Sequence, residues 1–212
     1  MSEIHRTTLT PGKLELLSGW LPAQPWYRGT GQPPELARAG GFRLDDPAGE
    51  VGIEFLFVSD SDGTTYSVPL SYHGAPMEGA ESALIGTSEH GVLGRRWVYD
   101  GARDPVLVAQ LLGCISGGVQ AQHQSESHTP DPSVTRHDGV PGGADTADWT
   151  TVPVDLHGGG AHQLQLARVL DGTPGNGDRP DPAARYLAAD ARLPDGTTAH
   201  RPVAVVRSAA TA

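Results

Sequence analysis

Residues 49–74 read GEVGIEFLFVSDSDGTTYSVPLSYHG, and this stretch decides the fold. Apolar side chains alternate from Val51 to Phe57 and again from Tyr66 to Tyr72, on either side of a turn-forming segment, Ser59–Gly63. Alternation with a period of two is typical of a half-buried strand, and the glycine-containing segment favours a hairpin loop. We therefore expect a two-stranded hairpin whose apolar side chains share one face and are covered by another element.

Residues 104–118 carry the signals of that covering element. Asp104-Pro105 is a helix start, apolar residues recur at helical spacing from Val106 to Ile115, and Gly117-Gly118 ends the pattern. A strand pattern at Arg38–Leu44 and another at Gly91–Asp100 add to the hairpin. The sequence thus predicts an α+β fold, in which a helix packs across a curved antiparallel sheet.

A loop rich in aromatic residues precedes the sheet. A short helix from Pro11 to about Gly19 leads into WLPAQPWYRG, residues 20–29, whose two prolines exclude a continuous helix. Such a loop is either buried as a plug of the core, which is the default, or exposed as a stacking surface. For the second alternative, the candidate ligand- or partner-binding residues are Trp20, Gln24, Trp26, Tyr27 and Arg28.

From this loop onward the sequence resembles the N-terminal cap domain of actinobacterial maltokinases and related aminoglycoside-phosphotransferase-like sugar kinases. The resemblance covers roughly Leu14 to Gly118 and rests on the order and spacing of five segments: Gln24-x-Trp26-Tyr27-x-Gly29 after a helix ending in Trp20-Leu21, Tyr66–Leu70, Ala83–Gly86, Trp97–Gly101 and the helix that starts at Asp104-Pro105. It implies a cystatin-like cap, which agrees with the helix-on-sheet fold expected from the residues.

The motifs of phosphate transfer do not accompany the cap in these 212 residues. A kinase of that family needs a loop of the type His-Gly-Asp-x-x-x-x-Asn and a second aspartate motif, and the sequence contains neither. We therefore expect a non-catalytic, stand-alone cap-like module that docks on a sugar kinase or another α-glucan or trehalose enzyme, or forms a homodimer. The alternatives are a saccharide- or nucleotide-binding accessory protein and, least favoured, an ATP-dependent sugar phosphotransferase.

The chain divides by composition into three parts. Residues 1–118 form the cap-like domain, and residues 119–148 are polar and suggest a flexible loop. Residues 149–212 contain short strand patterns, including a hairpin around Pro194-Asp195-Gly196, and carry few large side chains. We expect these C-terminal strands to extend or back the first sheet within the same domain.

Charge and composition narrow the partners and the location. The net charge of −10 argues against nucleic acid and anionic lipid as partners. No apolar run is long enough to span a membrane, no signal peptide is recognisable, and the single Cys114 fits a reducing cytoplasm. Lys13 is the only lysine, and we attribute the excess of arginine to the high-GC coding bias of actinobacteria.

The remaining chemical signals have plainer explanations. His157-Gly158-Gly159-Gly160 is similar to an oxyanion-hole loop but lacks a nucleophile motif, and His123, His128 and His137 lie in the polar stretch without metal-site spacing. The pairs Asp45/Asp46 and Asp60/Asp62 suit turns, and Cys114 suits the core. Arg95 and Arg96 could bind an anion, but they lie on opposite faces of a strand, so we expect at least one of them to face solvent. We therefore expect no catalytic residue, no metal and no cofactor.

Overall fold

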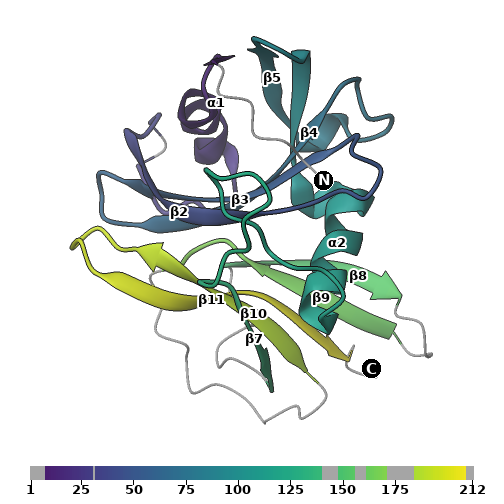
Figure 1. The fold of residues 1–212 in the computed structure, drawn as a ribbon. Helices are drawn as coiled ribbons and strands as arrows, with labels where there is room; N and C mark the ends of the chain where they lie inside the picture. Colours follow the sequence, from purple (N-terminus) through teal and green to yellow (C-terminus); the bar gives the residue numbers. More distant parts are fainter. Residues whose placement is uncertain (1–7, 31, 140–147, 156–160, 171–183, 209–212) are drawn as a thin grey trace.

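The computed structural model describes residues 8–30, 32–139, 148–155, 161–170 and 184–208 (Figure 1). In these residues an antiparallel sheet of 11 strands has the order β1-β5-β6-β4-β3-β2-β10-β11-β9-β8, with β7 also paired to β10. The strands are β1 (Leu9–Thr10), β2 (Leu36–Leu44), β3 (Gly52–Asp60), β4 (Thr65–His73), β5 (Leu84–His90), β6 (Gly94–Asp100), β7 (Thr135–Asp138), β8 (Trp149–Asp155), β9 (Ala161–Ala167), β10 (Arg185–Arg192) and β11 (Thr198–Ser208). The helices are α1 (Lys13–Trp20) and α2 (Pro105–Ser116), with short 3-10 turns at Leu21–Ala23, Glu81–Ala83 and Gly101–Arg103. The fold is α+β with a curved antiparallel sheet, as the sequence predicts.

The expected hairpin is formed by β3 and β4, but its two strands do not share one apolar face. In the register of the two strands, Leu56 pairs with Val68 and Val58 pairs with Tyr66. Tyr66 therefore lies on the same face of the hairpin as Val58, whereas Phe57 lies on the opposite face. Phe55 and Phe57 point into one core cluster, while Leu56, Val58, Tyr66, Val68 and Leu70 point into another on the opposite face. The prediction of a single apolar face was therefore wrong, because both faces of this hairpin are buried.

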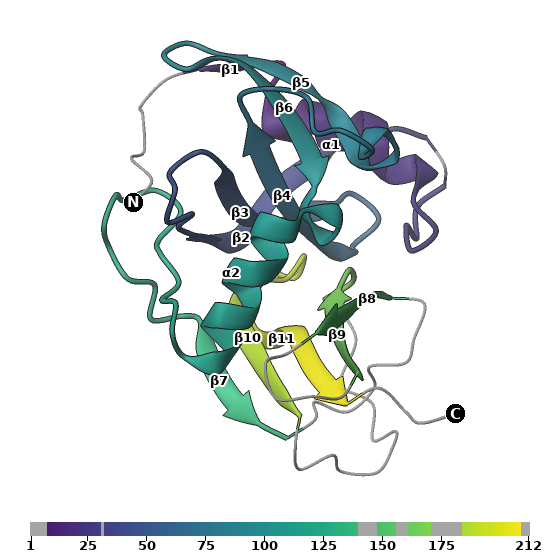
Figure 2. The same ribbon diagram turned by 90° about the vertical axis from the view of Figure 1, so that its right-hand side faces the viewer.

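Helix α2 covers the Phe55 face, as expected. The Asp104 carboxylate accepts hydrogen bonds from the backbone N–H groups of Val106, at 2.8 Å, and Leu107, at 3.4 Å, and Gly117 ends the helix at a φ of 94°. The buried side of the helix packs into the same core cluster as β2, β3 and the C-terminal strands. In Figure 2, α2 faces the viewer and runs from the upper half of the molecule, near β4, down to the lower half, near β7.

The C-terminal strands continue the first sheet and fold over its α2-covered face (Figure 1). Strand β10 joins β2 through the single pair Ala191–Gly40, and β10 and β11 form the predicted hairpin, closed by a bond from the Leu193 N–H to the Thr197 carbonyl. A second attachment follows β9, where Val169 forms an isolated bridge with Tyr66 of β4. The C-terminal strands are thus attached both to β2 and to β4.

Part of residues 119–148, the expected flexible polar loop, pairs with the sheet. After α2 the chain bridges Gln122 to Arg43 at the end of β2, and then forms β7, which pairs with β10. Residues 140–147 lie outside the described part of the chain, as do residues 156–160 with the glycine-rich segment that follows His157. Neither of the two described helices has the length and apolar character needed to cross a bilayer.

Candidate functional site

The aromatic loop lies on the face of β4 that α2 does not cover. Helix α1 and the 3-10 turn after it direct the loop back onto the sheet, where Trp26 packs at 6.0 Å and Tyr27 at 5.6 Å from the ring of Tyr66. Trp20 completes the group with an edge-to-face contact of 5.7 Å to Trp26. The loop is therefore built as a plug of the second core cluster, the default alternative of the sequence analysis.

The pattern Gln-x-Trp-Tyr-x-Gly has a structural explanation in this loop. The Gln24 side-chain amide donates a hydrogen bond of 3.2 Å to the carbonyl of Trp20 and so satisfies the end of α1. The Tyr27 ring lies directly against Gly29, where an added Cβ would stand 2.1 Å from the phenol oxygen. The spacing of these residues thus fixes the path of the loop.

Solvent reaches the five candidate residues to very different degrees. Trp26 is only 6% exposed, which removes it from any stacking surface. Trp20, Gln24 and Tyr27 are half-buried, and Arg28 is exposed. Arg28 forms an ion pair with Asp148, and its backbone N–H donates to the Tyr66 hydroxyl at 3.2 Å. Solvent therefore reaches part of the Trp20 and Tyr27 rings and the guanidinium of Arg28, which is paired with Asp148.

A buried arginine from the C-terminal part completes this cluster. Arg168 is 1% exposed, and its guanidinium lies 5.1 Å from the centre of the Trp26 ring. It donates to both carboxylate oxygens of Asp100, at 2.9 and 2.7 Å, and to the Thr150 hydroxyl at 2.8 Å. Its Nη1 is buried without a hydrogen-bond partner among the described atoms. Sequence reasoning missed this contact, because no pattern links residues that lie so far apart in the chain.

The Tyr66 hydroxyl sits at the centre of the same cluster. It donates a hydrogen bond of 3.0 Å to Asp60, whose other oxygen accepts from the backbone N–H of Thr64 in the hairpin turn. Burial is the main cause that raises the pKa of Tyr66, and the adjacent Asp60 carboxylate adds to it. Tyr66 therefore stays neutral and acts as a hydrogen-bonding anchor.

A second buried charge lies on the sheet beneath α1. Glu54, 3% exposed, accepts hydrogen bonds from Lys13 of α1, from Tyr72 at 2.7 Å and from Gln124 at 3.1 Å. Burial alone raises the pKa of this carboxyl, but the Lys13 ammonium and the hydrogen bonds outweigh burial and hold the pKa below its usual value. Glu54 thus ties α1 and the segment after α2 to one point of the sheet.

A third buried carboxylate belongs to the start of α2. Asp104 is fully buried and lies 2.6 Å from Nε2 of His73 at the end of β4. Burial opposes ionisation, but the His73 contact and the bonds at the helix start lower the pKa of Asp104 overall. This contact fixes α2 against the hairpin.

Asp46 and Arg95 behave as the sequence predicts. Asp46 accepts hydrogen bonds from the backbone N–H groups of Ala48, at 3.1 Å, and Val51, at 3.0 Å, so it shapes a turn. Arg95 pairs with Glu89 on an exposed strand surface. Among the described residues, no group of three or more histidine, cysteine or acidic side chains is arranged to hold a metal ion.

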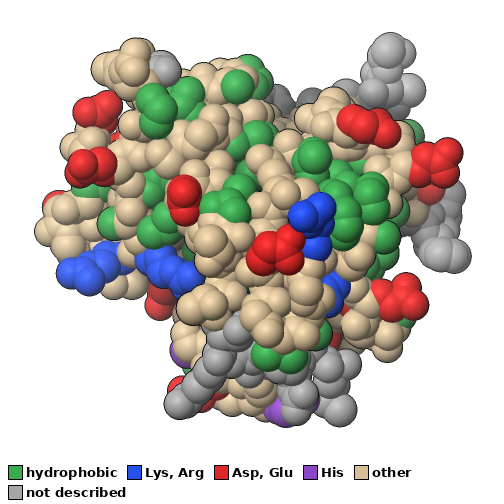
Figure 3. Space-filling view, turned by 90° about the horizontal axis from the view of Figure 1, so that it is seen from above, with side chains coloured by type: hydrophobic (Ala, Val, Ile, Leu, Met, Phe, Trp, Pro, Cys, Tyr) green, Lys and Arg blue, Asp and Glu red, His purple; other side chains and the backbone are tan. Residues whose placement is uncertain are grey.

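The β5–β6 end of the sheet carries exposed apolar side chains. Leu84, Val92 and Leu93 are 37%, 62% and 46% exposed, and all three belong to β5 or to the turn that joins it to β6. Figure 3 looks down on the α1 and β5 end of the molecule and shows hydrophobic side chains reaching the surface in several places. Within the part of the chain that the structure describes, β5 is the last long strand at this edge, and the two-residue β1 pairs with Glu89 and His90.

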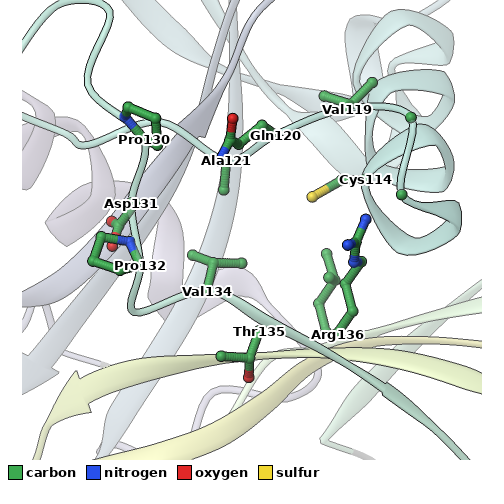
Figure 4. A pocket seen from close by; sticks show the side chains of 13 residues that line it. Cys114, Val119, Gln120, Ala121, Pro130, Asp131, Pro132, Val134, Thr135 and Arg136 are labelled. Atoms are coloured by element: carbon green, nitrogen blue, oxygen red, sulfur yellow. The ribbon is translucent and has the colours of Figure 1, made fainter.

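A groove of about 750 Å³ opens at the C-terminal end of α2, between the helix, the segment after it and β10 (Figure 4). The Cys114 thiol points into it, and the Arg136 guanidinium lies nearby against Gly117. Cys114 is 3% exposed, and burial raises the pKa of its thiol to about 11. A protonated, buried thiol is a poor nucleophile, so Cys114 belongs to the core, as predicted.

Comparison with known proteins bears on the segment that contains the aromatic loop. Residues 20–104 match the maltokinase N-terminal cap domain. The match runs from the end of α1 through β2–β6 to the first residue before α2, and it confirms the resemblance seen in the sequence. It covers less than half of the chain, so α2 and the C-terminal strands lie beyond it. In a search of curated proteins, no match was found.

Inside the maltokinase-cap-like segment lie most of the contacts described above. The aromatic plug, Tyr66, Glu54 and Asp100 all fall within residues 20–104, whereas Arg168 and the groove residues do not. The C-terminal part therefore adds to the cap-like segment a buried cation and a second set of strands.

Proposed function

We propose that this chain is a binding module that docks its cap-like segment onto a carbohydrate-metabolism enzyme, with a sugar kinase as the first candidate. The match of residues 20–104 to the maltokinase cap is the observation that carries the proposal. In this proposal the segment corresponds to the cystatin-like cap, works in the cytoplasm and has no catalytic role of its own. The missing phosphate-transfer motifs in the 212 residues support the last point.

The β5–β6 end is the proposed docking surface within that segment. The strand edge on the other side of the segment is β2, which already pairs with β10. Leu84, Val92 and Leu93 remain exposed at the β5 end, and exposed apolar side chains beside a strand edge suit a protein partner. Their number is small, so we expect a modest interface that supplements main-chain pairing.

The test measures binding between the purified chain and a maltokinase-type kinase from which the cap has been removed. We expect saturable binding by calorimetry, and the variant Val92→Asp/Leu93→Asp should weaken it at least tenfold because it places charge in an apolar contact. Thr151→Asp, on the exposed face of β8 far along the sheet, is the matched control. Absence of binding to kinases and to α-glucan or trehalose enzymes, or equal binding by both variants, contradicts the proposal. A homodimer through the same edge would appear as a doubled mass in light scattering that Val92→Asp/Leu93→Asp abolishes.

Recognition of a saccharide or nucleotide by the aromatic loop is the second candidate. It is supported by Trp20 and Tyr27, which stay half-exposed beside the exposed Arg28. Titration of tryptophan fluorescence with maltose, trehalose, glucosamine and ATP tests it, and Trp20→Phe should remove the response. Flat titrations with all four ligands contradict it.

A further inference from the structure

We propose that His137 and His200 form a site for a divalent transition-metal ion such as Zn²⁺ or Cu²⁺. His137 lies on β7 and His200 on β11, and the two strands flank β10, where they pair with Tyr186 and Asp190. The intervening residues Leu187 and Ala189 point into the core, so Tyr186, Asp190 and both histidines lie on the outer face of the sheet. This face is remote from the aromatic loop and independent of the proposed docking.

The two imidazoles converge on one point. Nε2 of His137 and Nε2 of His200 each lie 2.7 Å from the same atom, the hydroxyl oxygen of Thr135. The two nitrogens are therefore no farther apart than twice that distance. Tetrahedral zinc with bonds of about 2.0–2.1 Å needs imidazole nitrogens about 3.3 Å apart, so the two nitrogens have to approach each other by at most about 2 Å to bind one ion.

Neighbouring side chains already orient both rings for this purpose. Nδ1 of His200 lies 2.7 Å from a carboxylate oxygen of Asp190, a contact that places a proton on Nδ1 and leaves the Nε2 lone pair directed toward Thr135. A carboxylate that holds the far nitrogen of a histidine is the usual support of a metal ligand. The ring of His137 stacks on Tyr186, with centroids 4.7 Å apart and planes 16° apart, which fixes its plane.

The donor set selects the class of ion. Imidazole nitrogens suit zinc, copper and nickel, whereas calcium and magnesium prefer oxygen ligands. Two histidines leave further positions to the Thr135 hydroxyl and to water, so the site is open and solvent-accessible. The sequence groups His137 with His123 and His128 and not with His200, because His200 is distant in the chain and only the pairing with β10 brings the two together.

Calorimetric titration of the full chain with zinc chloride tests the proposal, with cupric ion and electron paramagnetic resonance as a second probe. We expect His137→Ala and His200→Ala each to weaken zinc binding at least tenfold, and Asp190→Asn to weaken it by about 10- to 100-fold. His123→Ala, in the segment after α2, is the matched control and should bind as the unmodified chain does. With copper we expect hyperfine coupling to two imidazole nitrogens, reduced to one in either histidine variant.

Three results would overturn the site: no zinc binding by the unmodified chain, unchanged affinity in the His137→Ala/His200→Ala double variant, or a copper spectrum that neither substitution alters. Because both histidines are exposed, the variants should unfold at the same temperature as the unmodified chain when no metal is added. That measurement separates lost ligation from lost folding.

Discussion

Replacing Asp100 with asparagine removes the negative charge that faces Arg168, while the new side chain keeps an oxygen for the Ala102 N–H. The guanidinium is 1% exposed and the Asp100 side chain 14% exposed, so the cation stays buried without its counter-charge. Removing one partner of a buried ion pair costs about 3–5 kcal/mol. For an m value of about 2 kcal/mol/M, the midpoint of urea unfolding should fall by about 2 M.

The compensating variant makes this prediction sharper. Arg168→Met removes the buried charge itself and keeps an apolar side chain against Trp26. We expect Asp100→Asn/Arg168→Met to be more stable than Asp100→Asn alone, because the unpaired cation is gone. Glu89→Gln is the control: its ion pair with Arg95 has side chains 61% and 59% exposed, and its loss should cost less than about 1 kcal/mol.

Urea unfolding followed by tryptophan fluorescence measures the unmodified chain, Asp100→Asn, Arg168→Met, the double variant and the Glu89→Gln control. Trp26 lies against Arg168, so its emission reports on the cluster as well as on global unfolding. A cost below about 1 kcal/mol for Asp100→Asn, or a double variant whose loss equals the sum of the single losses, would refute the reasoning.

Three further predictions concern local features. Gly29→Ala places a Cβ against the Tyr27 ring and should lower the stability of the fold by about 1–3 kcal/mol. Gly19→Ala, which has open space around it in α1, should leave the stability unchanged or raise it by up to about 1 kcal/mol. Thermal unfolding compares the two variants, and equal effects would contradict the packing argument. The pKa of Glu54 is lower in the folded chain than in the unfolded one, so its contribution to stability is present above about pH 4.5 and is lost as the pH falls through the folded pKa. Glu54→Gln should flatten that part of a curve of stability against pH, and an unchanged slope would contradict this role of Glu54. The pKa of Cys114 is raised to about 11 and its thiol is buried, so a thiol reagent at pH 8 should react only when the chain opens, and the reaction rate should rise with urea concentration. Rapid reaction in native buffer would show that the thiol is exposed.

Local signals predicted the elements of the fold well. The hairpin, the helix that starts at Asp104 and ends at Gly117, and the turn at Gly196 all appear where their capping and turn residues place them. The assignment of faces failed for two reasons. The register of β3 and β4 depends on the geometry of their connection, and β3 carries apolar side chains on both faces, with Leu56 and Val58 alternating with Phe55 and Phe57. Alternation distinguishes two faces only when one of them is polar.

The candidate site was only partly predictable. Sequence reasoning singled out Trp26 and Tyr27 as a group, and the structure brings them together on Tyr66. It did not find Arg168 or the contact of His137 with Thr135 and His200, since those depend on strand pairings between distant segments. Such contacts are set by tertiary structure and leave no periodic signal.

The position of Lys13 has a practical consequence for labelling. It is the only lysine of the 212 residues, and its ammonium is engaged by Glu54 and lies 5.4 Å from the Tyr72 ring. Amine-directed acylation therefore has one side chain to modify, and that side chain must leave its carboxylate before it reacts. The rate of acylation at this residue becomes a reporter of how often the Lys13 ammonium leaves Glu54.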